Sequence, residues 1–242
     1  MTSDGPVTVS FYRHGEVASH RGDVPLTDRG MRDAEAAGER LAEMLEPETE
    51  VALRHAPTRR TRQTLEALHR GARRALGPGS SVRFGEPQVE PAIRNPDLYV
   101  AGTRVEMVSS VDALVAQLPE GALTPDDVAS NRFFSRFWSE PDRVRVWLDD
   151  EDPPGERSSD VARRLFTFAR SLTNGAATTA RRYVLVTHSG PLRALLREFV
   201  LSEDPGEPEY AEAVHVTIAA DGTASWRFGD VQAVTSGARA TR

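Results

Sequence analysis

The sequence predicts an α/β protein, a three-layer α/β/α sandwich with a mostly parallel central sheet. Two observations carry this prediction. Short apolar runs of strand length alternate with stretches whose apolar residues recur at helical spacing. The length of 242 residues also fits a single domain, residues 1–242, with a core large enough to be self-sufficient.

The first elements are read from periodicity and capping residues. Val7, Val9 and Phe11 alternate with polar neighbours and predict a strand over about 7–12. Thr27 is a good cap for a helix over about 28–45, whose apolar positions repeat every three or four residues. The next expected elements are a short strand at 51–53, a helix at 58–76, and a broken strand within 82–90.

The second half is patterned less evenly. Residues 95–150 show weak periodicity and one amphipathic stretch, NRFFSRFW followed by DRVRVWL. A helix at about 157–172, a strand at 183–187 and a helix near 191–201 follow. A hairpin is expected around the AspGly pair at 221–222, and the chain is expected to fray from about 231.

Composition excludes several functions. All 30 basic residues are arginine, so chemistry that needs a lysine amine, as in P-loop NTPases, kinases, Schiff-base and pyridoxal-phosphate enzymes, is excluded. A net charge of −6 argues against nucleic acid as a partner. No apolar run approaches membrane-spanning length, and no secretion signal or cysteine is present, so we expect a cytoplasmic protein that binds no membrane.

Charged residues follow the predicted strands. Arg13 and His14 come after the first strand, Arg60 lies just beyond the second, Glu90 ends the third, and His188 follows the strand at 183–187. Because ligands of parallel α/β sheets bind beyond the carboxyl ends of the strands, we expect these side chains to meet at one edge.

These residue types suit phosphoryl transfer. Arginine forks match the oxygens of a phosphoryl group, and a neutral imidazole can attack phosphorus to form a phosphohistidine. A second imidazole can stabilise the equatorial oxygens, and a carboxylic acid can protonate the leaving oxygen. Such a site requires neither a metal nor a lysine.

Five segments, in order, resemble motifs of the histidine phosphatase (phosphoglycerate mutase-like) superfamily. RHGE at 13–16 is similar to its signature, and VLVTHSG at 184–190 resembles the strand that carries its second histidine. The others are PLTDRG at 25–30, APTRRTRQT at 56–64 and GERS at 155–158. The matches span about 7–200, and the ordered set is specific although RHG alone is weak.

The resemblance implies a role for each matching residue. His14 would be the phosphoryl-accepting nucleophile, and Arg13, Arg60 and His188 would form the phosphate pocket, with His188 also catalytic. Glu90 would be the acid and base, with Glu86, Asp97 and Glu106 as alternatives in the same region. Further phosphate contacts would come from Glu16 and from His20, which stands where many relatives carry asparagine. Two other departures are Ala56 and Asp33, where serine and glutamine are usual.

The weakly patterned segment at about 95–150 is expected to be a partly helical insertion over the active site, as in relatives. Its arginines could select the substrate or face solvent, with Arg132 and Arg136 as the candidates, beside Arg143 and Arg145. Its aromatic residues are interpreted as a small hydrophobic sub-core: Phe133, Phe134, Phe137 and Trp138.

The function predicted is metal-independent hydrolysis of a small phosphorylated metabolite through a phosphohistidine on His14. The alternatives are a phosphoglycerate-type mutase and a phosphoprotein phosphatase, and a non-catalytic binding module is least favoured because every required residue type is present. No cofactor is expected, and no histidine pair has metal-ligand spacing, so no metal is expected either. The sequence leaves a homodimer open.

Overall fold

The middle strands of the central sheet are rich in apolar residues that are buried in the structure. The computed structural model describes residues 5–19, 22–107, 110–173 and 182–236. In β1 (Val7–Arg13), Val9 and Phe11 are fully buried, and the strand pairs in parallel with β7 (Arg182–Thr187), which pairs in parallel with β2 (Glu50–His55). The short strands β3 (Arg83–Phe84) and β4 (Gln88–Val89) both extend β2 in parallel. The predicted parallel centre is confirmed.

The other half of the sheet is antiparallel. β8 (Ala213–Ile218) pairs with β1, β9 (Ala224–Phe228) pairs with β8, and β10 (Val231–Thr235) closes that edge. The strand order is therefore β10-β9-β8-β1-β7-β2-β3, and the sheet as a whole is mixed.

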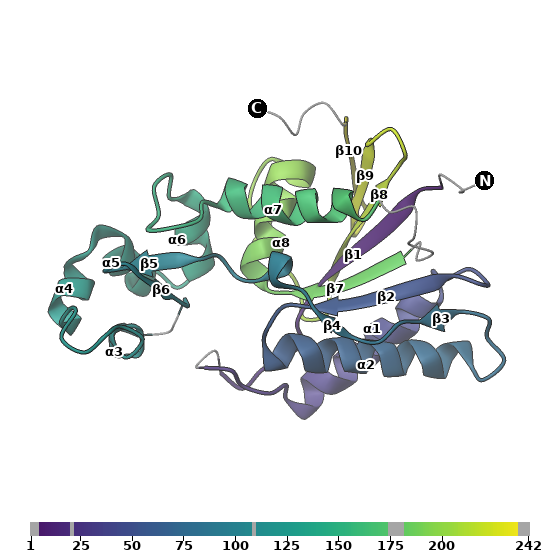
Figure 1. Ribbon diagram of the computed structural model, residues 1–242, viewed down its shortest axis with the longest axis horizontal. Helices are drawn as coiled ribbons and strands as arrows, with labels where there is room; N and C mark the ends of the chain where they lie inside the picture. Colours follow the sequence, from purple (N-terminus) through teal and green to yellow (C-terminus); the bar gives the residue numbers. More distant parts are fainter. Residues whose placement is uncertain (1–4, 20–21, 108–109, 174–181, 237–242) are drawn as a thin grey trace.

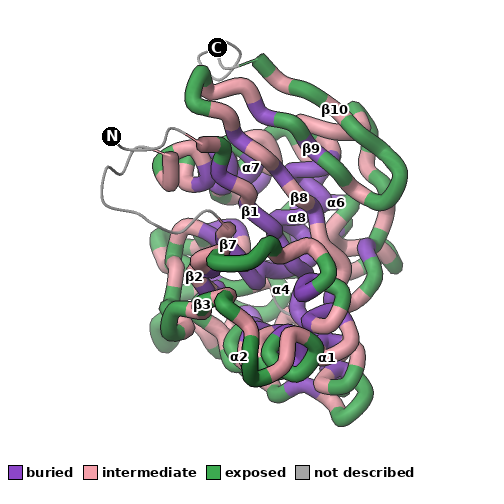
Figure 2. Tube along the Cα trace, turned by 90° about the vertical axis from the view of Figure 1, so that its right-hand side faces the viewer, coloured by how far each residue is buried: buried purple, intermediate pink, exposed green. Residues whose placement is uncertain are grey.

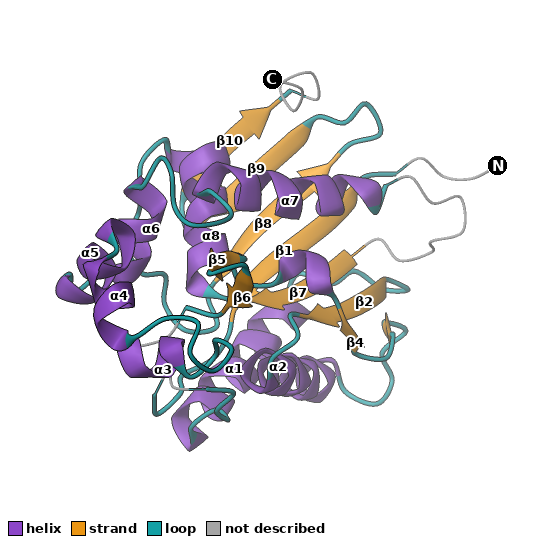
Figure 3. Ribbon diagram, turned by 60° about the vertical axis from the view of Figure 1, so that its left-hand side comes forward, coloured by secondary structure: helices purple, strands orange, loops and turns teal. Residues whose placement is uncertain are grey.

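Four helices complete the three layers (Figures 1 and 3). α1 (Asp28–Ala42) and α2 (Arg59–Leu76) cover one face, while α7 (Ser158–Ser171) and α8 (Ser189–Leu196) cover the other. α1 starts where predicted, because the Thr27 hydroxyl accepts a hydrogen bond from the Gly30 amide at 3.0 Å. It packs very closely on α2, since a Cβ on Gly71 would lie 1.9 Å from the Glu35 carbonyl oxygen. Figure 2 shows the buried chain gathered where the central strands meet α8.

The segment between β4 and α7 folds into short elements at the carboxyl ends of the parallel strands (Figure 1). They are a 3₁₀ turn (Pro91–Ile93), the hairpin β5 (Leu98–Val100) and β6 (Thr103–Val105), and the helices α3 (Val111–Val115), α4 (Pro125–Ser130), α5 (Arg132–Ser139) and α6 (Arg143–Asp149). We call residues 91–150 the cap. The aromatic sub-core predicted here is confirmed, because Phe133, Phe134 and Phe137 are buried and stack with one another and with Trp138.

The expected fraying from about residue 231 is wrong for residues 231–235. These residues form β10, whose backbone pairs with β9, and the Trp226 indole donates a hydrogen bond to the Thr235 hydroxyl at 2.9 Å. The sequence feature that indicates this hairpin is the Gly229–Asp230 pair, because Gly229 adopts a positive φ of 54° in the tight turn between β9 and β10. Within the described residues, no helix is both long and apolar enough to cross a membrane.

Candidate active site

The parallel register of β1 and β7 brings the two predicted histidines together. Arg13 lies opposite Thr187, and the His14 amide donates to the Thr187 carbonyl at 3.0 Å. His14 and His188 directly follow these two strands and therefore leave the sheet side by side, with ring centroids 5.3 Å apart. A cavity of about 350 Å³ opens over them, between the sheet edge and the cap, and is lined by both.

Backbone contacts orient the His14 ring. Its Nδ1 lies 2.8 Å from the Gly15 carbonyl oxygen, which can only accept, so Nδ1 carries the proton and Nε2 holds the lone pair in the neutral ring. His14 as a whole residue is 3% exposed. Gly15 is required here, because a Cβ would lie 2.8 Å from the Gly30 carbonyl oxygen, and its amide donates to the Thr64 hydroxyl at 2.8 Å.

Arg13 and Arg60 enter the same cavity from different elements. The Arg13 guanidinium pairs with Glu207 at 2.6 Å, contacts the Pro208 carbonyl, and lies 4.0 Å from the centre of the Tyr210 ring. Arg60 lies in the first turn of α2 and donates from Nη2 to His188 Nδ1 at 3.3 Å.

This donation fixes the neutral His188 ring with its proton on Nε2. Burial lowers the pKa of the Arg60 guanidinium, and Asp23 and Glu106 partly oppose that effect. Within the described part of the chain, the buried Nε atoms of Arg13 and Arg60 have no hydrogen-bond partner.

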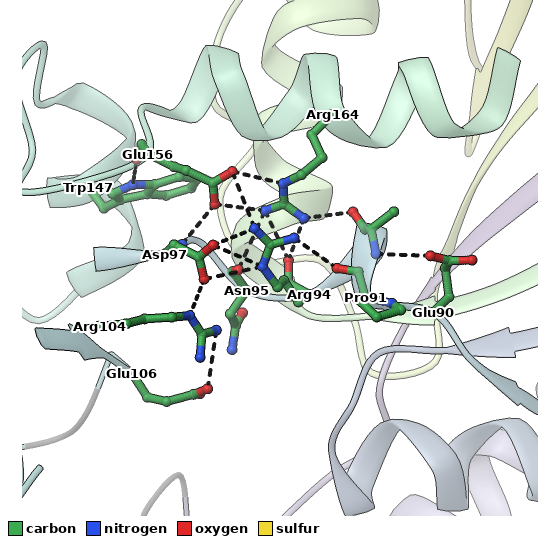
Figure 4. A network of polar contacts seen from close by, with 11 residues as sticks. Glu90, Pro91, Arg94, Asn95, Asp97, Arg104, Glu106, Trp147, Glu156 and Arg164 are labelled. Atoms are coloured by element: carbon green, nitrogen blue, oxygen red, sulfur yellow. Dashed lines mark hydrogen bonds and ion pairs between the residues drawn. The ribbon is translucent and has the colours of Figure 1, made fainter. Parts of the chain in front are cut away.

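The structure brings together four of the five residues predicted at the strand ends, and not Glu90. The Glu90 carboxylate caps the 3₁₀ turn by accepting from the Ala92 amide at 3.0 Å, and its other oxygen lies 3.5 Å from the Arg54 guanidinium. Glu90 does not line the cavity, and Figure 4 shows it at the far end of a polar network.

The alternative carboxylates lie elsewhere as well. Asp97 pairs with Arg94 and Arg104, and the hydrogen bonds from these two arginines lower the pKa of Asp97 to about 2 despite its burial. Glu106 is half-exposed and 3.7 Å from Arg104, and Glu86 is exposed. Neither lines the cavity.

Among the described residues, the carboxylates that do line the cavity are Asp142 and Glu207. Both are bound by Arg193, a fully buried residue of α8, at 2.7 Å and 3.2 Å. Burial opposes the charge of Arg193, but hydrogen bonds with Asp204 and Asp142 raise its pKa, and Arg193 in turn lowers the pKa of Asp142.

Sequence reasoning missed Asp142, Arg193 and Glu207. For Asp142, the sequence offers one indication, its suitability as a helix cap. In the structure it caps α6 by accepting a hydrogen bond from the Arg145 amide at 3.0 Å. Glu207 lies in an unpatterned loop, and Arg193 sits within a helix without any motif.

The remaining predicted residues lie away from the cavity or outside the described chain. Glu16 accepts from the Thr27 hydroxyl at 2.7 Å and so supports the start of α1, and His20 is not among the described residues. Arg132 and Arg136 do not line the cavity, and Arg136 pairs with Asp150 at 3.6 Å. Of the cap arginines, Arg143 lines it.

Comparison with known proteins identifies the family of the chain. Residues 9–78 and 124–224 match the model of the histidine phosphatase superfamily (branch 1), and the chain belongs to that family. The superfamily predicted from the motifs is therefore confirmed. No curated protein matches the sequence.

Solved structures share the fold at low sequence identity. A mycobacterial glucosyl-3-phosphoglycerate phosphatase in complex with VO3 is 20% identical, with a TM-score of 0.53 over 92% of this chain and 97% of that one. Phosphoglycerate mutase from Bacillus anthracis is 13% identical, with a TM-score of 0.54 over 100% and 99%. Phosphoserine phosphatase from Entamoeba histolytica is 12% identical, with a TM-score of 0.50 over 97% and 98%.

Proposed function

We propose that this protein hydrolyses a small phosphate monoester, without a metal, through a phosphohistidine on His14. The observation that carries the proposal is the hydrogen bond from His14 Nδ1 to the Gly15 carbonyl oxygen. It leaves the lone pair on Nε2, in a cavity that also contains two guanidinium groups and a second imidazole. A neutral imidazole held in this way is a competent nucleophile toward phosphorus.

The surrounding groups match the charge of the phosphoryl group. Arg13 and Arg60 can each donate to its oxygens, and their unpartnered Nε atoms are further donors for that purpose. His188, with its proton on Nε2, can donate to an equatorial oxygen as negative charge spreads over the transferring group. After the alcohol leaves, water attacks the phosphohistidine and phosphate is released.

The test is phosphate release from a panel of phosphomonoesters in the presence of EDTA. We expect His14→Ala to reduce release at least about 10³-fold, as removal of a nucleophile does elsewhere. His55→Ala is the matched control, because the His55 Nδ1 makes the same 2.8 Å contact with the next carbonyl at the end of β2 but does not line the cavity.

Each result has a definite meaning. Release that survives in His14→Ala would refute the assigned nucleophile. An isomeric product formed only with a bisphosphate primer would establish the mutase alternative, and release from phosphopeptides in preference to small esters would establish the phosphoprotein alternative.

A further inference from the structure

A groove lies on the antiparallel half of the sheet, with a volume of about 330 Å³ and no lining residue in common with the cavity of the candidate active site. It opens on the face of the sheet that α1 and α2 cover over β2 and β7, and Figure 1 shows both helices lying away from β8, β9 and β10. Its polar lining includes Thr8, Arg182, His215, Thr217, Ser225 and Arg227, and we call it the sheet groove.

The register of the strands brings three basic residues onto this face. His215 pairs with Ser10 on one side and with Arg227 on the other, so these side chains share a face. Arg182 pairs with Thr8, which lies two residues before Ser10 and therefore points the same way. One guanidinium group thus comes from β7 and the other from β9, with β1 and β8 between them.

The two guanidinium groups converge although two strands separate them. Arg182 Nη2 donates to the Met44 carbonyl oxygen at 3.0 Å, and Arg227 Nη2 lies 3.4 Å from the sulfur of the same residue. A thioether is a weak acceptor, so the second contact is readily exchanged for a stronger one. Each guanidinium has five N–H donors, and within the described residues each forms this one hydrogen bond and no ion pair.

Arginine charges dominate the electrostatics of the groove. Burial lowers the pKa of Arg182, and so does the charge of Arg227, while Tyr12 and Glu46 act in the opposite direction. Burial raises the pKa of Tyr12 to about 12, against the opposing charges of Arg182, Arg40 and Arg227. A partly buried cation without an ion-pair partner is unfavourable, so an anion bound beside Arg182 would be stabilising.

From this geometry we propose that the sheet groove binds a tetrahedral oxyanion, inorganic phosphate or the phosphate group of a small ester, between Arg182 and Arg227. Two guanidinium groups balance the charge of a dianion, and their N–H forks match its oxygens. The Ser225 hydroxyl, opposite Thr217 in the same groove, is a further donor. The site shares no residue with the proposed hydrolysis and does not depend on it.

His215 can report whether the groove is occupied. Burial, and then the charges of Arg227 and Arg182, lower the pKa of His215 to about 4. The other groups at its ring are the Ser10 hydroxyl, 2.8 Å from Nδ1, and the Tyr12 ring, edge-on at 6.3 Å. An anion between the two arginines offsets their charge and so raises the pKa of His215. By linkage, protonation of His215 strengthens anion binding by the same factor.

The first test follows the imidazole resonance of His215 by NMR in the full-length protein as sodium sulfate is added. Sulfate is a tetrahedral dianion at every pH used, and the resonance is identified by its absence in His215→Gln. We expect a saturable change of this resonance, and no comparable change with sodium chloride at equal ionic strength. A change that never saturates, or an equal change with chloride, would overturn the site.

Arg227→Gln is the variant for this titration, because Arg227 is exposed and its replacement carries little risk to folding. We expect the Kd for sulfate to rise at least about tenfold, as for the loss of a hydrogen bond from a charged group. Arg83→Gln is the matched control, because Arg83 is also an exposed strand arginine but pairs with Glu50 at 2.8 Å on the far side of the sheet. Equal weakening by the two substitutions would mean a response to net charge alone and would overturn the assignment.

The second test distinguishes the two sources of the oxyanion. Inorganic phosphate and glycerol phosphate are titrated separately, at neutral pH, into His14→Ala, which lacks the proposed nucleophile and therefore spares the ester. Saturation of the His215 resonance by either ligand supports the site, and the tighter ligand identifies the source. Saturation by neither overturns it.

The third test is the linkage between the anion and the His215 proton. In saturating sulfate we expect the pKa of His215 to rise from about 4 to about 5, which corresponds to about tenfold tighter sulfate binding by the protonated form. Sodium chloride at equal ionic strength is again the control. A pKa that is the same in both salts would place any bound sulfate away from Arg182 and Arg227, and would overturn the site.

Discussion

At the scale of single residues, His14 and His55 share one local geometry but differ in what surrounds them. His14 directly follows β1 and His55 is the last residue of β2, and each has its Nδ1 2.8 Å from the carbonyl oxygen of the following residue. Only His14 lines the cavity with Arg13, Arg60 and His188. The ring orientation is therefore a local property of the strand end, whereas the reactivity we assign depends on the adjacent Arg13 and on neighbours from two other segments.

Glu90 provides the sharpest test at this scale. We expect Glu90→Gln to lower the free energy of unfolding by about 1 kcal/mol, because the amide replaces a charged cap of the 3₁₀ turn and loses the pairing with Arg54. We expect kcat to change by less than about threefold, since the carboxylate lies outside the cavity. Urea titration and steady-state kinetics on one preparation measure both. A loss of about 10²-fold or more in kcat would restore Glu90 as the acid predicted from the sequence.

Arg143 is the cap arginine that reaches the cavity, and it forms no ion pair within the described residues. We expect Arg143→Ala to raise KM for a phosphate ester that carries a carboxylate, by roughly threefold to tenfold, and to affect an ester without a second anionic group less. Arg145→Ala is the control, because Arg145 belongs to the same helix but is exposed and pairs with Asp149. Similar KM changes in the two variants would show that only overall charge matters.

At the scale of elements, sequence patterns predicted the central strands and long helices well, and the cap poorly. β1, α1, α2, α7 and β7 have strong periodicity because each buries one face or both against the core. Arg13, His14, Arg60 and His188 could be predicted because they lie at the ends of such elements or directly after them. The cap elements have three to eight residues, too few for periodicity to emerge, so its arginines could not be assigned to the cavity or to solvent from the sequence.

Arg193 joins three elements and gives a prediction at this scale. Its guanidinium binds Asp142 at the start of α6, and Asp204 and Glu207 in the loop after the π-helical turn Arg197–Leu201. We expect Arg193→Met to lower the free energy of unfolding by about 3–5 kcal/mol, because it leaves carboxylates without their partner. Denaturant midpoints measure this. Arg197→Met is the control, since Arg197 pairs with Asp149 at the surface, where about 1 kcal/mol or less is expected. Equal losses would argue against the network.

At the scale of the whole molecule, the parallel half of the sheet contributes to the cavity and the antiparallel half does not. The parallel half sets its carboxyl ends under the cap and so builds the cavity. The antiparallel half, β8 to β10, contributes no residue to that cavity, and one of its faces carries His215 beside Arg227 and Arg182. A residue there can change stability without changing the candidate active site.

This separation leads to a prediction for stability as pH falls. Burial, reinforced by Arg227 and Arg182, lowers the pKa of His215 to about 4, and its Nδ1 lies 2.8 Å from the Ser10 hydroxyl oxygen. Between pH about 6.5 and about 4, the unfolded chain binds a proton at His215 and the folded protein does not. The free energy of unfolding therefore falls as pH falls through that window, by about 3 kcal/mol in total.

Asp97 acts at lower pH. Its folded pKa of about 2 lies below the ordinary value, so its stabilising contribution is present above pH about 4 and is lost as pH falls toward 2. Denaturant titrations from pH 7 to 3 separate the two groups. His215→Gln should flatten the decline between pH 6.5 and 4 and leave the loss below pH 4 unchanged, because glutamine does not titrate. An unchanged slope above pH 4 in that variant would mean that the histidine is not the group that takes up the proton.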